Sequence, residues 1–309
     1  MEQKELALLQ EFENLHKEYY LIRSSRIYRI GLKVSKFIDS LRKGTLLKYI
    51  HTERSYRMIA KFNHKFPKST FDYGDYPDIL PKIAVYTCVT GGYDAVEIPK
   101  LMFPNIDYIL FTDNVSKKNP VWDVRPLPVE SENQPNNTLK SRYCKMHPQI
   151  VGKEYDYAFF IDGNICIYSN ITNMINAISK KTGLAIHRHS VRNCIYEELE
   201  ACIIAKRGKI EEMRNQVAAY KKEGFPEQFG LLETTVVLTD LKNPVALDIL
   251  DGCWHELASK STRDQLGLPY AIWKRGYKID DIGNLGYNLM INPKFRKVSH
   301  AKCIDKKEE

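Results

Sequence analysis

The feature of this chain that most restricts its fold is an alternation, after residue 82, of short apolar segments with longer amphipathic ones. The short segments are rich in β-branched and aromatic residues and predict strands: "KIAVYTCV", "IDYILFT", "YAFFID", "GLAIH" and "LLETTVVLTD". The longer segments predict helices: "NTLKSRYCKMHPQI", "NITNMINAISKK", 193–205, 209–222, "NPVALDILDGCWHELAS" and "TRDQLGLPYAIWKRG". This alternation predicts an α/β fold with a mainly parallel sheet flanked by helices.

The first eighty residues have a different character and predict a separate helical region. Basic residues lie mostly on one side of a predicted helix, and five apolar residues recur at helical spacing elsewhere around it. The apolar residues are Ile27, Ile30, Val34, Phe37 and Leu41. Such a helix either docks on the protein's own body or binds an anionic membrane surface through residues 20–65. Each basic residue near such a surface contributes about 1 kcal/mol to the free energy of membrane binding. The prolines of "FPKSTFDYGDYPDILPK" predict a linker. We therefore predict an N-terminal helical, basic region with its linker at 1–80 and a second domain at 81–309.

Charge and cysteine content limit the partners and the compartment. The net charge of +8 is concentrated in the N-terminal region and favours an anionic partner. No predicted strand carries the closely spaced exposed aromatics of an RNA-binding platform, so no nucleic acid is expected. The seven cysteines never form a CxxC pair, which argues against a disulfide framework and a structural zinc. Without a signal-peptide pattern or an apolar run of ~20 residues, we expect a cytoplasmic protein, peripheral on the inner membrane face.

Polar residues and glycines gather at the predicted ends of the strands. In parallel sheets ligands bind at the carboxyl ends of the strands. The residues in such positions are Thr90, Gly91, Gly92, Asp113, Asp162 and Asn164. The Gly-Gly pair does not form a GxGxxG pattern and the chain has no GxxxxGK[ST], so dinucleotide-binding and P-loop proteins are disfavoured.

The segment "FFIDGNI" interrupts an apolar stretch with Asp162 and Asn164. A buried charge costs several kcal/mol unless it is paired or bound to a metal. The two oxygen-bearing side chains suit Mg²⁺ or Mn²⁺, whereas Asp-Gly and Gly-Asn are also strong hairpin signals. Upstream, Arg142 and Lys145 share one helical face and form either a solvated charge run or a site for a diphosphate.

Seven ordered segments between Lys82 and His300 resemble a known family. They are "VYTCVTGGYD", "ILFTD", "KSRYCKMHP", "FFIDGNI", "HRHSVRNCIYEE", "GFPEQFGLLET" and "RDQLGLPYA". Together they resemble the glycosyltransferase-like domain family named for plant turgor-defect and mucilage-related proteins. The resemblance implies a GT-A type fold, in which a Rossmann-like nucleotide-binding half is merged with an acceptor-binding half, similar to glycosyltransferase family 8.

The resemblance also implies a metal site. In that class an Asp-x-Asp motif holds Mn²⁺ or Mg²⁺ on the diphosphate of a nucleotide sugar. Asp162 corresponds to the first carboxylate, and Asn164 replaces the second, which keeps an oxygen ligand but removes a charge. By the same analogy His300 is a late metal ligand and Lys302 contacts the diphosphate.

Further roles follow from the same resemblance. The residues expected to bind the nucleotide sugar are Thr87, Gly91, Gly92, Tyr93 and Asp113, with Arg142 and Lys145 near the phosphates. The expected catalytic residues on the sugar side are Glu233, Asp264 and Gln265, and those facing the acceptor are His187, His189 and Arg192.

The sequence thus predicts a metal-dependent, hexosyltransferase-like glycosyltransferase. It would move a sugar from a nucleoside diphosphate donor, with uridine diphosphate as one candidate, to a glycan or lipid-linked acceptor in surface polysaccharide synthesis. Two alternatives stay open. A metal-dependent nucleotidyltransferase would use similar carboxylates and release pyrophosphate, and the Asn164 replacement is also compatible with a catalytically silent sugar-binding module.

Overall fold

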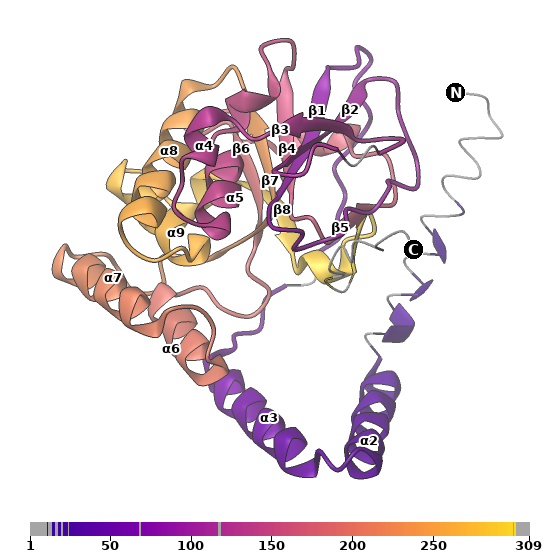
Figure 1. Ribbon diagram of the computed structural model, residues 1–309, viewed down its shortest axis with the longest axis vertical. Coiled ribbons are helices and arrows are strands. Elements are labelled where there is room, and N and C mark those ends of the chain that lie inside the picture. Colours follow the sequence, from indigo (N-terminus) through magenta and orange to yellow (C-terminus); the bar gives the residue numbers. More distant parts are fainter. Residues whose placement is uncertain are drawn as a thin grey trace.

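The computed structural model describes residues 25–67, 69–116, 119–298 and 300, together with 11, 14, 15, 18, 19 and 21–23. The chain forms a layered α/β body from which a helical hairpin projects on the side of α6 (Figure 1). The hairpin consists of α2 (Arg26–Arg42) and α3 (Leu46–Ile59).

The body is organised around one mixed sheet. In the described residues seven strands run in the order β3-β2-β1-β4-β7-β6-β8. Their bounds are β1 Ile83–Val89, β2 Ile106–Thr112, β3 Asp123–Pro126, β4 Tyr157–Ile161, β6 Leu184–Arg188, β7 Leu232–Asp240 and β8 Gly283–Tyr287. Strand β7 is antiparallel to both neighbours, and the other pairs are parallel. The predicted α/β class with a mainly parallel, helix-flanked sheet is confirmed.

Short strands and helices complete the described elements. A separate antiparallel pair consists of β5 (Ile165–Ile167) and β9 (Phe295–Lys297). The remaining α-helices are α4 Val129–Glu132, α5 Asn137–Met146, α6 Ile195–Ala205, α7 Ile210–Lys222, α8 Pro244–Ser259 and α9 Asp264–Lys274. The 3-10 helices are η1 Ala60–Phe62, η2 Pro148–Val151, η3 Thr172–Ala177, η4 Ile279–Asp281 and η5 Leu289–Ile291.

The two faces of the sheet bury separate apolar clusters, because successive side chains of a strand point to opposite faces. On one face Tyr86 and Phe160 pack with residues of α5, α8 and α9. On the other face Val85 and Phe159 pack with Phe295 and the segments around η3 and η5. A third cluster joins α6, α7 and α9.

The helix predicted over "NITNMINAISKK" is wrong in type, because the segment forms only the 3-10 helix η3. Two of its asparagine side chains form hydrogen bonds with a segment about 100 positions earlier in the chain. Asn173 and Asn176 donate through their side-chain amides to the carbonyls of Gly74 and Tyr73. Such side-chain bonds compete with the backbone pattern of an α-helix.

The segment predicted as a linker packs along strand β8. The ring of Phe66 stacks on Tyr287 with centroids 4.9 Å apart, and the Ser69 hydroxyl donates to the Tyr287 carbonyl at 3.3 Å. The Tyr73 hydroxyl donates to the Leu285 carbonyl at 2.9 Å. The segment therefore covers the outer strand of the sheet, which would otherwise present unpaired backbone groups.

The apolar stripe of α2 is exposed rather than docked on the body. Its five residues have exposed fractions from 41% to 85%: Ile27, Ile30, Val34, Phe37 and Leu41. The hairpin closes on itself where Phe37 meets Tyr49 edge-on at 5.9 Å and Lys33 pairs with Glu53 at 3.6 Å. The expectation that this helix docks on the protein's own body is therefore wrong.

A close approach of η3 to the sheet predicts a sensitive glycine. A Cβ atom at Gly283 would lie 2.0 Å from the Ala177 carbonyl oxygen and 2.8 Å from that of Leu184. Because backbone atoms cannot move aside cheaply, we expect Gly283→Ala to lower the free energy of unfolding by about 1–3 kcal/mol, measured by urea denaturation.

Gly31→Ala is the matched control. No atom lies within 4 Å of a Cβ at Gly31, which lies inside α2. Because alanine is favoured over glycine in a helix, Gly31→Ala should raise the free energy of unfolding by roughly 0.5–1 kcal/mol. Equal stability of Gly283→Ala and the wild type would contradict the packing.

Candidate functional site

The turn after β1 and the end of β2 meet at one edge of the sheet. The Gly91 amide donates to Oδ2 of Asp113 at 2.8 Å. Both Gly91 and Gly92 have φ of +62°, a left-handed conformation that favours glycine. A Cβ at Gly91 would lie 2.3 Å from Nδ2 of Asn137, the first residue of α5. The N-terminus of α5 therefore lies beside the Gly-Gly turn.

The segment Asp162 to Asn164 forms a tight turn after β4. The Asp162 carbonyl accepts a hydrogen bond from the Ile165 amide at 2.9 Å. The following strand, β5, pairs with β9 and not with β4, so this turn is not the loop of a β4–β5 hairpin. A Cβ at Gly163 would lie 2.8 Å from Cγ2 of Val89 and 3.3 Å from Cβ of Asp94. The turn is thus packed against the end of β1.

A buried lysine connects this turn to helix α9. Lys145 is 1% exposed, and its Nζ lies 2.7 Å from Oδ2 of Asp264 and 3.5 Å from Oδ1 of Asp162. Arg142 reaches the same Asp264 oxygen at 3.1 Å. Lys145 and Arg142 therefore converge on a carboxylate and do not form a solvated charge run.

Asp264 stays ionised between these cations. Burial alone would raise the pKa of its carboxyl group, but the charges of Arg142 and Lys145 outweigh burial and hold the pKa well below its usual range. Its Oδ1 also accepts a hydrogen bond from the Gln265 amide at 3.1 Å. The Gln265 side-chain oxygen is buried and has no hydrogen-bond partner among the described residues.

The pKa of Glu233 is shifted upward, opposite to that of Asp264. Glu233 lies at the start of β7, which runs antiparallel and so begins at the edge where β4 ends. Burial, together with the negative charges of Asp162 and Asp264, raises the pKa of Glu233, although the Thr235 hydroxyl donates to it at 2.6 Å. Neighbouring acids with pKa values shifted in opposite directions are typical of catalytic sites.

His300 joins the edge from the C-terminal segment. Its Nδ1 lies 2.9 Å from Oδ1 of Asp94, and its Nε2 lies 3.4 Å from Nδ2 of Asn164. Sequence reasoning did not select Asp94, although it ends the "VTGGYD" segment that carries part of the family resemblance. Lys302 lies outside the described residues.

Several other predicted residues are buried away from this cluster. His187 accepts a hydrogen bond from Nδ2 of Asn292 at 2.9 Å, and burial lowers its pKa to about 3. Burial likewise lowers the pKa of His189 to about 4, and Arg192 pairs with Glu198 at 2.7 Å. Thr87 is also completely buried. As they lie, these side chains would have to become exposed before they could contact a ligand, so their binding roles stay predictions.

Tyr93 has the opposite environment, since it is 62% exposed and its ring lies 5.1 Å from that of His300. It is therefore available to a ligand at this edge. Its assignment to the nucleotide stays a prediction.

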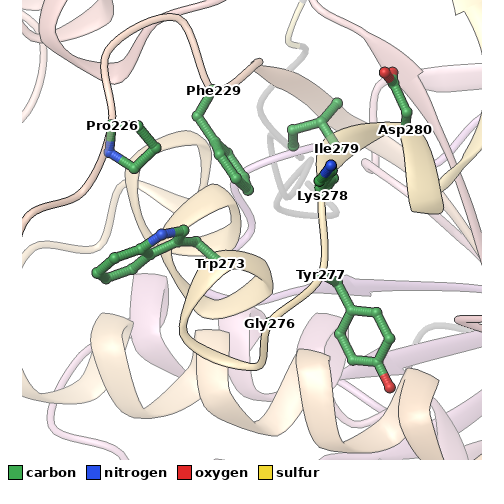
Figure 2. A pocket seen from close by; sticks show the side chains of 8 residues that line it. All are labelled: Pro226, Phe229, Trp273, Gly276, Tyr277, Lys278, Ile279 and Asp280. Atoms are coloured by element: carbon green, nitrogen blue, oxygen red, sulfur yellow. The ribbon is translucent and has the colours of Figure 1, made fainter.

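A pocket of about 480 Å³ lies elsewhere, between α9 and the segment before β7. Figure 2 shows Trp273 and Phe229 on its rim, with the hydroxyl group of Tyr277 directed away from Phe229. The predicted site residues do not line this pocket. The chemistry expected from the sequence is therefore placed at the strand ends and not here.

A comparison with models of protein families shows to which family the chain belongs. The family model described as TOD1/MUCI70, glycosyltransferase-like domain, matches residues 145–300. The chain belongs to this family. The match contains Lys145, Asp162, Glu233, Asp264 and His300. The earlier part of the resemblance, from Lys82 to Cys144, lies before it.

Solved structures of glycosyltransferases show distant similarity to the chain. The WbbM bifunctional glycosyltransferase has a TM-score of 0.40 and 11% identity; the match covers 65% of this chain but only 39% of that protein. The galactosyltransferase LgtC has a TM-score of 0.35 and 12% identity, covering 61% of this chain and 69% of LgtC. Mouse xyloside xylosyltransferase 1 has a TM-score of 0.35 and 12% identity; the match covers 72% of this chain and 96% of that protein. A search of curated proteins finds no match.

The donor atoms at the edge of the TOD1/MUCI70 domain suit a divalent cation bound together with a diphosphate. Asp162 offers a carboxylate, Asn164 an amide oxygen and His300 an imidazole nitrogen, and Asn164 and His300 are in contact. Within the described residues no three His, Cys, Asp or Glu side chains come close enough to hold a metal by themselves. The set therefore fits a cation that takes part of its oxygen ligands from substrate.

Asp264→Asn tests the buried charge cluster. Breaking a buried ion pair costs about 3–5 kcal/mol, so the variant should have a lower free energy of unfolding at neutral pH. Because the folded pKa of Asp264 lies below the unfolded value of about 3.9, its stabilising contribution is complete above that value. It is lost as the pH falls toward the folded pKa.

The difference in unfolding free energy between wild type and variant should therefore begin to narrow below about pH 4, as urea denaturation from pH 3 to 7 would measure. Asp280→Asn is the control, because the Asp280 carboxylate is fully exposed and its ion pair with Arg188 is long, at 4.0 Å. Exposed pairs of this kind contribute little to stability, so the unfolding free energy of this variant should stay close to the wild-type value. A difference that stays constant across this range would show that Asp264 does not act as the ionised partner of Lys145.

Proposed function

We propose that this chain is a glycosyltransferase that moves a sugar from a nucleoside diphosphate donor to a glycan or lipid-linked acceptor. The observation that carries the proposal is the cluster of Lys145, Asp162, Glu233 and Asp264 at the sheet edge, inside the region matched by a glycosyltransferase-like domain. Ligands of α/β sheets bind at such an edge.

The donor nucleotide would lie against the Gly91 turn and the N-terminus of α5, which are packed together because Gly91 has no Cβ to collide with Asn137. Asp113 already orients the Gly91 amide, and the neighbouring Gly92 also has a positive φ. The α5 N-terminus beside this turn favours a negatively charged phosphate. Arg142, whose Nε has no hydrogen-bond partner among the described residues, lies on the same helix.

Asp162, Asn164 and His300 would hold Mn²⁺ or Mg²⁺, which when bound supplies positive charge to the leaving diphosphate. Lys145 would act from the protein side by fixing the Asp162 carboxylate in place. Since Lys145 is held by two aspartates, its contribution to the phosphates is electrostatic and needs no direct contact.

Glu233 is the residue best suited to handle the acceptor proton. Its raised pKa makes the ionised carboxylate a stronger base than an ordinary glutamate. It would accept the proton of the acceptor hydroxyl as that oxygen bonds to the sugar. Asp264, which is held ionised by two cations, would orient the neighbouring groups instead.

The transferase proposal predicts release of a nucleoside diphosphate when the protein is incubated with Mn²⁺, a panel of nucleotide sugars and candidate glycan acceptors. Asp162→Ala should abolish this release, and Glu233→Gln should lower kcat/KM by about 10²–10⁴-fold, the usual contribution of a general base. The raised pKa of Glu233 should move the acidic limb of the pH profile above the value of about 4.3 for an ordinary glutamate.

Asp280→Asn, in which an exposed carboxylate outside the cluster is replaced, should retain wild-type turnover. Turnover of no donor, or full activity in Asp162→Ala, would contradict the proposal. Release of pyrophosphate would instead identify a nucleotidyltransferase.

The exposed face of the projecting hairpin suggests that the protein binds its acceptor at a membrane surface. The stripe of α2 that includes Ile27 and Ile30 is exposed, and Arg26, Arg29 and Lys33 lie on the same helix. In the described part of the chain no helix has the length and apolar character needed to span a bilayer. An exposed apolar stripe beside basic residues fits an anionic membrane surface, where a lipid-linked acceptor of surface polysaccharide synthesis would be held.

Vesicle binding tests the membrane proposal. The full chain should sediment with vesicles containing anionic lipid and not with zwitterionic ones, and added salt should weaken binding. Ile27→Asn should weaken partitioning about 10- to 100-fold, because burying an isoleucine contributes about 1.5–3 kcal/mol. The control is Ile79→Asn, since Ile79 is 88% exposed against 85% for Ile27 but lies outside the hairpin.

Equal binding of the two variants would contradict the role of α2. Concentration-dependent dimerisation of the wild type without vesicles, lost in Ile27→Asn, would show that a second copy covers this face instead.

A further inference from the structure

Asp94 is a buried carboxylate that the sequence pattern left without a role. It is 7% exposed and follows the Gly-Gly turn after β1. We infer that Asp94 is a positioning residue, which orients His300 so that its Nε2 can bind the metal beside Asn164. The inference rests on the proposed function, because it concerns the metal of the same site.

The contact between Asp94 and His300 fixes which ring nitrogen remains for a metal. Both carboxylate oxygens of Asp94 face Nδ1 of His300, at 2.9 and 3.1 Å. A carboxylate accepts hydrogen bonds, so Nδ1 carries a proton and donates it, which leaves Nε2 with a lone pair when the ring is neutral. Metal-binding histidines usually donate their second nitrogen to a carboxylate in this way.

The position of Nε2 agrees with this role. It lies 3.4 Å from Nδ2 of Asn164, the residue that replaces the second acid of an Asp-x-Asp motif, and accepts a hydrogen bond from it that a bound metal would replace. The same Nδ2 also lies 3.3 Å from the Val298 carbonyl. Both of these side-chain contacts of Asn164 use its nitrogen, so its oxygen can serve a cation.

Packing holds Asp94 against the Asp162 turn. A Cβ at Gly163 would lie 3.3 Å from Cβ of Asp94 and 3.5 Å from its Oδ2, so the glycine permits the approach. Asp94 therefore connects the turn after β1, the turn after β4 and His300. This arrangement places a negative charge near the position where the Asn164 replacement removed one.

The inference predicts how Mn²⁺ affinity depends on Asp94. Mn²⁺ binding to the full chain is measured by the electron paramagnetic resonance signal of the free ion, with uridine diphosphate present as the diphosphate probe. Asp94→Asn should weaken Mn²⁺ binding about 10- to 100-fold, the usual effect of removing a carboxylate that orients a metal-binding histidine. Asp280→Asn should bind as the wild type does.

A double-mutant cycle separates positioning from a merely structural effect. If Asp94 acts through His300, Asp94→Asn should cause no further loss of Mn²⁺ affinity in a His300→Ala background. A structural role would lower the free energy of unfolding without metal while leaving the Mn²⁺ affinity of the folded protein unchanged. Unchanged affinity in Asp94→Asn, or an equal loss with and without His300, would overturn the inference.

The wild type and Asp162→Ala distinguish this inference from the proposed function. Tight Mn²⁺ binding by the wild type that is lost in Asp162→Ala but kept in Asp94→Asn would overturn the role of Asp94 and leave the metal site intact. Failure of the wild type to bind Mn²⁺ with uridine diphosphate would overturn both.

Discussion

The buried ammonium group of Lys145 is the interaction on which the site depends. A charge removed from water costs several kcal/mol unless opposite charges and hydrogen bonds compensate it. Here the compensation comes from Asp264 at the start of α9 and from Asp162 after β4. Because both carboxylates must stay near Lys145, helix α5, helix α9 and the β4 turn are held in one arrangement. The partly exposed carboxylate of Asp162 is thus linked to the charge cluster of the interior.

The same charge network continues toward the helical hairpin. Arg263, next to Asp264, pairs with the buried Glu198 at 2.6 Å, and Glu198 also pairs with Arg192. Nη1 of Arg192 lies 3.4 Å from Oδ1 of Asn63, just after η1. The root of the hairpin is therefore attached to the domain that carries the site, although the apolar stripe of α2 remains exposed. This attachment would fix the direction in which the site faces a membrane that binds α2.

Glu233 and Asp264 show how the same chemistry acquires different roles. Both are acids in the interior of the same domain, and burial disfavours the charged form of each. Asp264 has two cations in contact and remains ionised, whereas Glu233 is influenced by two nearby carboxylates and holds its proton to higher pH. The opposite pKa shifts of the two carboxyl groups therefore follow from their neighbours.

The sequence by itself determined the features that depend on local patterns. The β-branched segments and helical periodicities predicted the main strands and helices, and the positions of Gly91 and Asp113 after two of those strands predicted that both would lie at the carboxyl edge of the sheet. It missed β3, β5 and β9, because three or four residues carry too little periodicity. It also missed β8, whose sequence GNLGY contains two glycines and no β-branched residue. It also assigned an α-helix to 170–181, where Asn173 and Asn176 bond to a distant segment instead.

Only the tertiary structure decided which polar residues share a site. Asp94 and His300 are 206 positions apart and contact each other only because the chain returns to the end of β1. The buried His187 likewise has its hydrogen-bond partner in Asn292, which no local pattern connects with it. Sequence patterns specify residue types and local geometry, whereas charge compensation and burial are properties of neighbours brought together by folding. For that reason the sequence determined the fold class and the family, and the structure decided which carboxylates are paired with cations, which has a raised pKa and which contacts a histidine.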